Sequence, residues 1–516
     1  MTRLALLSAS NKTGIVELAH SLVTEFGFEL ISSGGTAKTL QAAGIPVIKV
    51  SDYTGSPEIL GGRVKTLHPR IHGGILARQD LLEDLADLAA NNIRPMDLVV
   101  VNLYPFEQTI AQPNVTLAEA IEQIDVGGPA MLRAAAKNFA HLTVLCSPTQ
   151  YEGYLNELRS ESSLKPSLAF RQASALQAFQ HTAAYDRAIA AYLESQDALK
   201  SPDQTWTLTG TQIQALRYGE NPHQSAAWYQ TGGTPSGWAA AEKLQGKELS
   251  YNNLVDLEAA RRIIAEFPTT QAAATIIKHT NPCGTALGDT LLQAYEKALN
   301  ADAMSAFGGI VALNQAIDSP TATALTQTFL ECVVAPGCDP EAAKILSAKS
   351  KVRVLVMPDL VSASAQTDIK PIAGGFLMQT ADEQSADAAT WRVVTAKQPT
   401  EAQLAELLFA WKVCRHVKSN AIVVTRDRAT LGVGAGQMNR VGSAKIALEQ
   451  AGERAKGATL ASDGFFPFDD SVRTAAAAGI ESIVQPGGSL RDQDSIQAAD
   501  ELGLVMVFTG VRHFLH

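Results

Sequence analysis

AAATIIKHTNPCG, residues 272–284, is the stretch from which the larger part of this chain can be interpreted. Its first six residues form an apolar run typical of a buried strand in an α/β sheet. Lys278 and His279 follow at once, and Pro282 with Gly284 predicts a turn. Ligands of open α/β sheets bind at the carboxyl ends of strands, and histidine is the usual proton-transfer side chain. We therefore expect a reactive pair here, although a solvated lysine beside a turn-capping histidine would give the same pattern.

Length and composition limit the class of protein. A chain of 516 residues, 46% hydrophobic and 18% charged, predicts a globular protein of two to four domains. Its formal net charge of -10 and pI of about 5.6 argue against a general nucleic-acid or membrane-surface binder. The apolar start is too short for a signal peptide and no later run matches a membrane span, so we expect a cytoplasmic protein. Five cysteines without a C-x-x-C pair indicate reduced thiols.

Two strand-to-helix turns near the amino terminus are rich in small polar residues. SASNKTG (residues 8–14) follows a predicted strand at 4–7, and SSGGT (residues 32–36) follows one at 29–31. Exposed amides at the start of a helix attract anions, and glycines let the backbone approach a ligand closely. One such turn would be ordinary turn chemistry. Two of them, the first carrying Lys12, predict a phosphate site.

A basic loop follows at residues 61–74, GGRVKTLHPRIHGG. Pairs of glycines bracket its two arginines, one lysine and two histidines, which favours a ligand-binding loop over a merely solvated one. Metal binding by His68 and His72 is a third interpretation. It would need a helix, which Pro69 and the glycines make improbable, and no carboxylate lies between the two histidines.

Three further elements complete the first third. The apolar run at 97–106 predicts a buried strand whose end presents Asn102 and Tyr104. Asp125 is placed as the N-cap of a helix that carries Lys137, where either residue could have a purely structural role. After a capping Ser167, residues 168–193 have the pattern of a long amphipathic helix.

These motifs together resemble one known family. SASNKTG, SSGGTAKTL, GGRVKTLHP, NLYPF and IDVGGPAMLRAAAKN resemble, in order, the inosine monophosphate cyclohydrolase half of the bifunctional purine-biosynthesis enzymes. The resemblance implies a methylglyoxal-synthase-like α/β domain. A polar segment with a proline at 200–205 predicts the domain boundary, giving domains of residues 1–199 and 200–516.

The remaining two thirds hold two misleading patterns. The glycines at 432–436 suggest a dinucleotide loop, but G-x-G-x-x-G needs glycine where Gln437 or Asn439 stands. Pro282-Cys283 suggests a zinc deaminase, but Ala286 occupies the position of the second cysteine of P-C-x-x-C. The order of elements suggests a pair of related α/β subdomains, although no clean sequence repeat is visible.

A second set of motifs resembles the other half of the same family. LRYGENPHQ, KHTNPCG, SAFGG, GVGAGQMNR, SDGFFPFDDSV and TGVRHF resemble the aminoimidazole carboxamide ribonucleotide (AICAR) transformylase half. This implies two cytidine-deaminase-like subdomains that lack zinc. Asn439 stands where the family pattern has serine and Gly464 where it has alanine, which puts local contacts in question.

The resemblance implies two consecutive reactions and a homodimer with shared transformylase sites. Formyl transfer from the cosubstrate 10-formyltetrahydrofolate to AICAR would precede dehydrative closure of the formylated product (FAICAR) to inosine monophosphate (IMP), with no metal required. For transfer it implies His279 for proton transfer, Lys278 for the oxyanion and Asn420 for the substrate amide. Substrate binding would involve Arg217, Tyr218 and Arg512, and folate binding Phe307, Gly308, Phe465, Phe466 and Asp470. Closure would use Lys65, Tyr104, Asp125 and Lys137, with Ser10, Lys12, Ser33, Gly35, Thr36, Arg63, Thr66, Asn102 and Gly127 holding the nucleotide.

Two other classes of function stay open on the sequence. A regulatory protein that only binds nucleotides would need the phosphate contacts but not Lys65 together with Lys137. A nucleoside deaminase would need zinc ligands, which the motifs lack.

Overall fold

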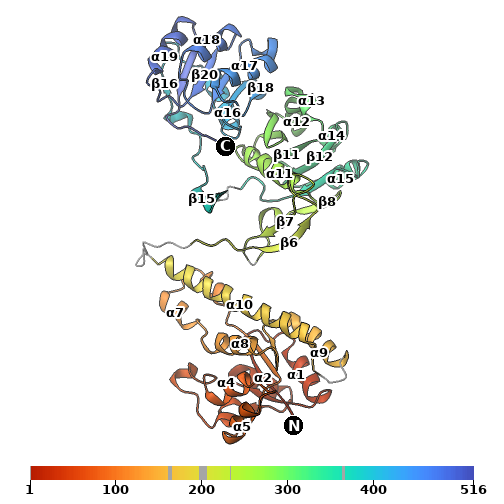
Figure 1. The fold of residues 1–516 in the computed structure, drawn as a ribbon. Helices are drawn as coiled ribbons and strands as arrows, with labels where there is room; N and C mark the ends of the chain where they lie inside the picture. The colour runs from red at the N-terminus through yellow and green to blue at the C-terminus, as the bar shows by residue number, and fades with distance from the viewer. Residues whose placement is uncertain (1, 161–164, 197–205, 233, 363–366) are drawn as a thin grey trace. The chain divides into compact units, whose positions relative to one another are not determined.

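The computed structural model describes residues 2–160, 165–196, 206–232, 234–362 and 367–516 (Figure 1). The chain forms two compact units, Met1–Trp206 and Thr207–His516. The segment predicted as the domain boundary, residues 200–205, lies outside the described residues. No helix in the described part of the chain combines the length and apolar character needed to cross a membrane.

The first unit contains a five-stranded parallel sheet in the order β3-β2-β1-β4-β5. Its strands are β1 (Arg3–Ala9), β2 (Phe28–Ser32), β3 (Ile48–Lys49), β4 (Leu98–Asn102) and β5 (Thr143–Leu145). Successive residues of β1 enter different cores, with Leu4 and Leu6 in one cluster and Ala5 and Leu7 in another. Because strand side chains alternate between faces, both faces of this sheet are covered.

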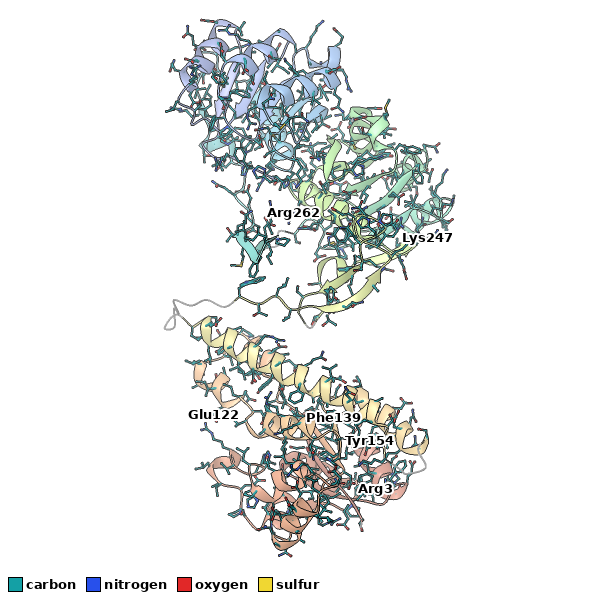
Figure 2. The ribbon with its side chains drawn as sticks, in the orientation of Figure 1. Arg3, Glu122, Phe139, Tyr154, Lys247 and Arg262 are labelled. Carbon is teal, nitrogen blue, oxygen red and sulfur yellow. The ribbon has the colours of Figure 1, made fainter. Side chains whose placement is uncertain are left out.

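Ten α-helices of the described residues belong to this unit. They are α1 (Ile15–Thr24), α2 (Gly34–Ala42), α3 (Val50–Thr54), α4 (Pro69–Leu76), α5 (Leu82–Ala90), α6 (Phe106–Ile110), α7 (Leu117–Glu122), α8 (Gly127–Lys137), α9 (Tyr151–Ser160) and α10 (Leu168–Glu194). The predicted helix and its Ser167 cap are confirmed, with Ser167 accepting a hydrogen bond from the Phe170 amide at 3.2 Å. The predicted apolar face is wrong in part, because Leu176 and Phe179 are exposed and the buried face consists mainly of small and polar residues. Helix α10 packs on α8 and β5, and Tyr154 of α9 is almost fully buried (Figure 2).

Helix α4 contradicts the expectation that Pro69 and its neighbouring glycines exclude a helix. Proline is favourable at the first helical position, where its missing N–H has no partner to lose. His68 caps the helix by accepting from the Arg70 amide through Nδ1 at 3.1 Å. A Cβ on Gly74 would lie 2.6 Å from the Arg94 carbonyl oxygen, so this glycine serves close packing rather than a turn.

The second unit is built on a twelve-stranded sheet in the order β16-β21-β20-β19-β17-β18-β10-β9-β11-β12-β13-β8. One half comprises β8 (Glu242–Gln245), β9 (Ala272–Lys278), β10 (Asn281–Gly288), β11 (Gly309–Leu313), β12 (Leu330–Ala335) and β13 (Arg353–Val356). The other comprises β16 (Arg392–Val393), β17 (Ile422–Arg426), β18 (Ala429–Gly434), β19 (Thr459–Ser462), β20 (Ser482–Gln485) and β21 (Val505–Phe508). Read outward from the β10–β18 seam, the halves have matching element order, which confirms the predicted pair of related subdomains.

Helices and two separate hairpins complete the unit. The α-helices are α11 (Tyr251–Ile264), α12 (Leu291–Ala301), α13 (Ala303–Ala306), α14 (Ser319–Leu325), α15 (Pro340–Ser347), α16 (Glu401–Cys414), α17 (Arg440–Ala451), α18 (Asp470–Ala477) and α19 (Asp492–Glu501). The hairpins pair β6 (Thr211–Leu216) with β7 (Ala226–Gln230) and β14 (Thr367–Ile372) with β15 (Gly375–Thr380). Helices α11 and α16 occupy equivalent places, α11 against β9 and β11 and α16 against β17 and β19.

The turn predicted at Pro282 and Gly284 lies elsewhere. β9 and β10 form an antiparallel hairpin whose turn is His279 and Thr280, while Pro282 and Gly284 lie inside β10 at a register shift. A Cβ on Gly284 would collide with the Ala298 carbonyl oxygen of α12. This glycine is therefore required for strand–helix packing. The expected ligand-binding end of a strand is instead the tip of an antiparallel hairpin.

Candidate active sites

A cavity of about 790 Å³ opens at the carboxyl ends of β1, β2 and β4. It is lined by every residue that the sequence analysis placed in this unit's site, apart from Lys137. Parallel strands end at one edge of a sheet, which brings the turns after β1 and β2 together with the polar residues after β4. The predicted residues therefore form one site.

One end of this cavity is suited to an anion. Gly34 and Gly35 begin α2, with no side-chain cap on the helix among the described residues, so free amides face the cavity. The Lys12 ammonium donates to Thr36 Oγ1 at 3.1 Å. A Cβ on Gly34 would lie 3.5 Å from Lys65 Nζ, which places both ammonium groups beside the glycine turn. Burial and, secondarily, the charge of Lys65 lower the pKa of Lys12.

Asp125 lies in the same cavity, held by backbone amides. Its Oδ1 accepts from the Gly128 amide at 2.9 Å, as expected of an N-cap residue, although α8 itself begins at Gly127. Burial raises the pKa of Asp125, while the two glycine amides and Lys65 oppose that shift. The Asp125 amide donates to the Tyr185 hydroxyl at 2.8 Å. Tyr185 on α10 was missed by the sequence analysis because only the fold brings it to residue 125.

Lys137 and Arg63 differ from the expectation. Lys137 is the exposed last residue of α8, ten residues after Gly127 and thus about 15 Å along the helix. It does not line the cavity that Lys65 lines. Arg63 does line it, but its guanidinium is ion-paired with Glu122, which Figure 2 labels. A ligand would have to compete with that carboxylate for Arg63.

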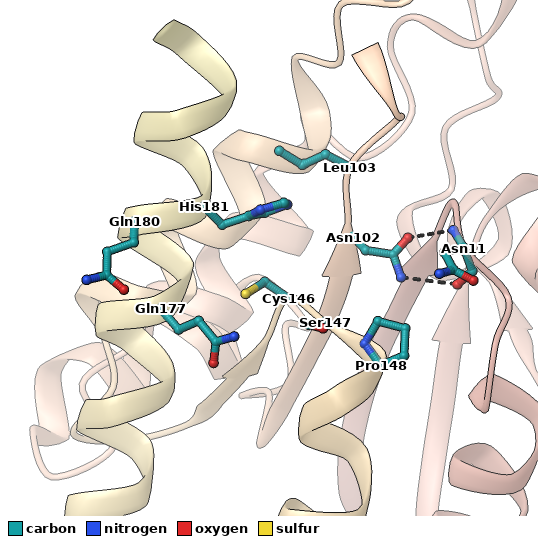
Figure 3. Close-up of a pocket in the computed structure, with 9 residues that line it drawn as sticks. All are labelled: Asn11, Asn102, Leu103, Cys146, Ser147, Pro148, Gln177, Gln180 and His181. Carbon is teal, nitrogen blue, oxygen red and sulfur yellow. Dashed lines mark hydrogen bonds between the residues drawn. The ribbon is translucent and has the colours of Figure 1, made fainter. Parts of the chain in front are cut away.

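A second cavity, of about 450 Å³, shares Asn102 with the first (Figure 3). The Asn102 amide pairs with the backbone of Asn11, accepting from its N–H at 2.7 Å and donating to its carbonyl at 3.1 Å. His181 of α10 lies on another side of it, with a buried Nε2 that has no hydrogen-bond partner among the described residues. Burial raises the pKa of the Cys146 thiol there to about 11, so this thiol is a poor nucleophile at neutral pH.

In the second unit, Lys278 ends β9 and reaches the loop before β11. Its ammonium donates to the Phe307 carbonyl, and a Cβ on Gly308 would lie 3.7 Å from Lys278 Nζ. The Phe307 ring is 60% exposed and packs at 5.1 Å, centroid to centroid, against Phe329. Three predicted residues, one cationic and one aromatic among them, therefore meet beside the His279 turn.

Asn420 is joined to this turn across the seam between the subdomains. The Lys418 amide donates to Asn281 Oδ1 at 3.0 Å, which ties the segment before β17 to the β9–β10 hairpin. The Asn420 side chain donates to the Gln437 carbonyl at 2.8 Å and accepts from Arg440 at 2.7 Å. Its amide is thus held rigidly, and a substrate can use only its remaining hydrogen-bonding capacity.

Arg440 and Asp463 are the buried pair behind Asn420, and the sequence analysis missed both. They form an ion pair with side chains 6% and 0% exposed. Both residues lie in motifs quoted for the family resemblance. A charged residue within a run of small or apolar residues was the sequence feature that could have indicated a buried ion pair. The two family departures are close by and have simple explanations. Asn439 caps α17 as a serine would, and the Arg440 guanidinium occupies the space that a Cβ on Gly464 would need.

The carboxyl-terminal tail brings Arg512 to the same region. Ser419 and Leu515 pair through their backbones, with the Ser419 amide donating at 2.9 Å, and the Leu515 amide donates to the Ser419 hydroxyl at 3.0 Å. Arg512 itself lies over the Phe514 ring at 4.6 Å. Arg217 similarly stacks on Tyr218 at 5.4 Å, in an exposed turn after β6.

The folate residues predicted near α18 divide into two groups. Phe466 is fully buried in the core of its subdomain, so its prediction as a folate contact is corrected to a packing role. Phe465 is half-buried and Asp470 is exposed at the start of α18, where both remain accessible. No group of three metal-ligating side chains occurs among the residues that the structure describes.

Comparison with known proteins identifies the family. The model described as "MGS-like domain" matches residues 14–130, and that described as "AICARFT/IMPCHase bienzyme" matches residues 135–450. Proteins named "Bifunctional purine biosynthesis protein PurH" from Nostoc sp. and Trichormus variabilis are each 73% identical to this chain, and one from Synechocystis sp. is 70% identical. Each alignment covers 100% of both chains. The chain therefore belongs to the AICARFT/IMPCHase bienzyme family, whose formyltransferase and cyclohydrolase activities carry out the last two steps of purine biosynthesis to IMP.

Proposed function

We propose that the two reactions use separate sites, one in each unit. The carrying observation is the cavity of the first unit, where two ammonium groups flank a glycine turn and a half-buried carboxylate, that of Asp125, lies in the same cavity. This arrangement suits a nucleotide whose phosphate binds at α2 and whose base reaches Asp125. Ring closure is thus assigned to residues 1–199 and formyl transfer to residues 200–516.

For ring closure, the carboxamide nitrogen of FAICAR attacks its formyl carbon, and the formyl oxygen takes up negative charge. It leaves as water with two protons, one from the attacking nitrogen, passed on by Asp125, and one from the formamido nitrogen, which forms the ring C=N bond as the C–O bond breaks. Lys65 and Tyr104 stabilise that oxygen, and Asp125 accepts the proton from the attacking nitrogen. Asp125 is suited to this because burial raises its pKa and makes it a stronger base. Lys137 is not part of this proposal within one chain, since it lies at the far end of α8.

For formyl transfer, the 5-amino nitrogen of AICAR attacks the formyl carbon of 10-formyltetrahydrofolate. His279 takes the proton from the amine and returns it to the departing folate nitrogen, while Lys278 stabilises the tetrahedral oxyanion. Asn420 orients the carboxamide, and Arg217, Tyr218 and Arg512 hold the nucleotide. The exposed Phe307 ring beside Lys278 supports a folate contact there, which we extend to Gly308, Phe465 and Asp470.

Further properties follow as part of the same proposal. The enzyme works in the cytoplasm as a homodimer on small-molecule substrates, without nucleic acid, membrane or catalytic metal. The acidic net charge supports the exclusion of nucleic acid, and the chemistry of both steps needs no Lewis acid. Full-length resemblance to bifunctional enzymes favours this function over a nucleotide sensor or a deaminase.

The testing experiment separates the two steps. Purified protein is mixed with AICAR and 10-formyltetrahydrofolate, and the products are identified by mass. We expect IMP from the wild type, accumulation of FAICAR from Lys65→Ala, and no FAICAR from His279→Ala. The His279→Ala protein should still close added FAICAR. Parallel loss of closure in that folded variant would refute the two-site assignment, and normal IMP output from Lys65→Ala would remove Lys65 from catalysis.

A further inference from the structure

The hairpin turn that carries His279 has an unfavourable backbone conformation. His279 and Thr280 have φ of 51° and 63°, the left-handed region that two-residue hairpins usually fill with asparagine, aspartate or glycine. Threonine is β-branched and especially disfavoured there. Such a conformation persists only where the surrounding structure holds it in place.

Asp256 of α11 is the group that holds this turn. Its Oδ1 accepts from the Thr280 amide at 2.7 Å, and the His279 amide also faces the carboxyl group. Helix α11 packs against β9 and β11, so the carboxylate is carried by a rigid element. Neither the family motifs nor the predicted site residues include Asp256.

The sister subdomain contains the same device without an imidazole. Its β17–β18 turn consists of Asp427 and Arg428, with φ of 55° and 53°. Glu406 of α16 accepts from the Arg428 amide through Oε2 at 2.8 Å. In both halves, a carboxylate on the helix before the hairpin binds the second amide of a left-handed turn. The carboxylate therefore has the same structural role in both halves, namely to hold a left-handed turn. Only in the first half does that turn carry a histidine, His279.

We propose that Asp256 is a positioning residue for formyl transfer: it fixes the left-handed turn so that the His279 ring is held in reach of the reacting amine. This inference rests on the proposed role of His279. Without the carboxylate, the Thr280 amide loses its acceptor and the turn relaxes toward commoner backbone conformations. The ring then leaves its place, although every substrate contact of the other residues remains.

The test compares variants of the two equivalent carboxylates in the full-length enzyme. The measurements are kcat and KM of formyl transfer, closure of added FAICAR, and the melting temperature. We expect Asp256→Ala to lower kcat about 100-fold, the effect of displacing a catalytic group by roughly 1 Å. KM for both substrates should stay within about threefold, since Asp256 acts on a catalytic group rather than on binding. Asp256→Asn retains an acceptor oxygen and should recover kcat to within about tenfold of the wild type.

Glu406→Ala is the matched control. It removes the same kind of turn contact, so it should lower the melting temperature as Asp256→Ala does while leaving kcat within about twofold. If the two alanine variants lose formyl transfer equally, or if Asp256→Ala keeps wild-type kcat, the inference is wrong. Should Asp256→Ala fail to fold, Asp256→Leu decides, because it keeps a similar volume but has no acceptor atom: a lower kcat at unchanged KM supports the inference, and an unchanged kcat overturns it.

His279→Ala, measured in parallel, distinguishes this inference from the proposed function. Wild-type formyl transfer by His279→Ala would overturn the role of His279 and the inference with it. An inactive His279→Ala together with a fully active Asp256→Ala would overturn the inference alone.

Discussion

Gly128→Ala should disable ring closure by displacing the Asp125 carboxylate. Gly128 is the second residue of α8, and its amide donates to Asp125 Oδ1 at 2.9 Å. A Cβ there would lie 3.0 Å from the Asp125 carboxyl carbon, 2.8 Å from Leu103 Cδ2 and closer still to Asp125 Oδ2. The carboxylate and the new methyl group therefore cannot keep their present places together.

The expected size of the effect follows from that crowding. Restoring ordinary van der Waals contact moves the carboxylate by roughly 1 Å, a displacement that can cost about 100-fold in rate. Overpacking costs about 1–3 kcal/mol of stability. Replacing a helical glycine by alanine returns about 1 kcal/mol. The net loss of stability should be small, so a large fall in rate would report on the site rather than on unfolding.

The assay is single-turnover closure of added FAICAR, measured beside formyl transfer and the melting temperature. Formyl transfer should be unchanged because its residues belong to the other unit. Gly153→Ala is the control, since a Cβ at this position in α9 would make ordinary contact with Phe170 Cε2 at 3.6 Å. It should leave both reactions intact and raise stability by up to about 1 kcal/mol.

Closure by folded Gly128→Ala within about threefold of the wild type would show that the reaction does not depend on the Asp125 carboxylate position. A comparable loss in Gly153→Ala would show instead that the unit responds to any glycine substitution. Either result would refute the reasoning from the crowded carboxylate.

Three further predictions concern the same cavity. Burial raises the pKa of Asp125, and closure needs its ionised form, so the closure rate should fall as pH decreases through a value above the ordinary carboxyl range. The residual rate of Asp125→Asn should lack this decrease, which a rate profile from about pH 4 to about pH 8 checks. Tyr185→Phe should cost about 1–2 kcal/mol by leaving the Asp125 amide unpaired, and chemical denaturation measures it. Burial and the charge of Lys65 lower the pKa of Lys12, so FAICAR binding should weaken as pH rises, at a lower pH than for an ordinary lysine. Lys12→Met should raise KM and abolish this pH dependence, which measurement of KM against pH tests.

Much of the first unit could be predicted from the sequence because its signals are local. Apolar runs, glycine turns and a serine cap predicted β1, β2 and α10, and the two turns with Lys12 predicted a phosphate site. The family resemblance, rather than a local rule, added Lys65 and Asp125 to that site. Helix α4 was predicted wrongly because proline and glycine are helix breakers only on average. Pro69 is at the first position of the helix, where proline is favourable. Gly74 is inside the helix because the Arg94 carbonyl oxygen leaves no room for a side chain.

The His279 turn of the second unit shows the opposite case. Local rules placed the bend at Pro282 and Gly284, yet the chain bends at His279 and Thr280, which no local propensity favours. The bend depends on the Asp256 carboxylate, 24 residues away in sequence. Long-range contacts of this kind override local preference, and they are invisible until the helix and the hairpin pack together.

The sequence by itself determined the α/β class, two sets of motifs in order, and the kind of chemistry that Lys278-His279 and Lys65 can perform. Those properties depend on residue type and on spacing along the chain. Only the tertiary structure decided that Lys137 lies outside the cavity that Lys65 lines, that Phe466 is core, and that the chain turns at His279 and Thr280 within the 272–284 stretch. These depend on which distant segments meet, and burial and hydrogen-bond pairing across the fold determine that.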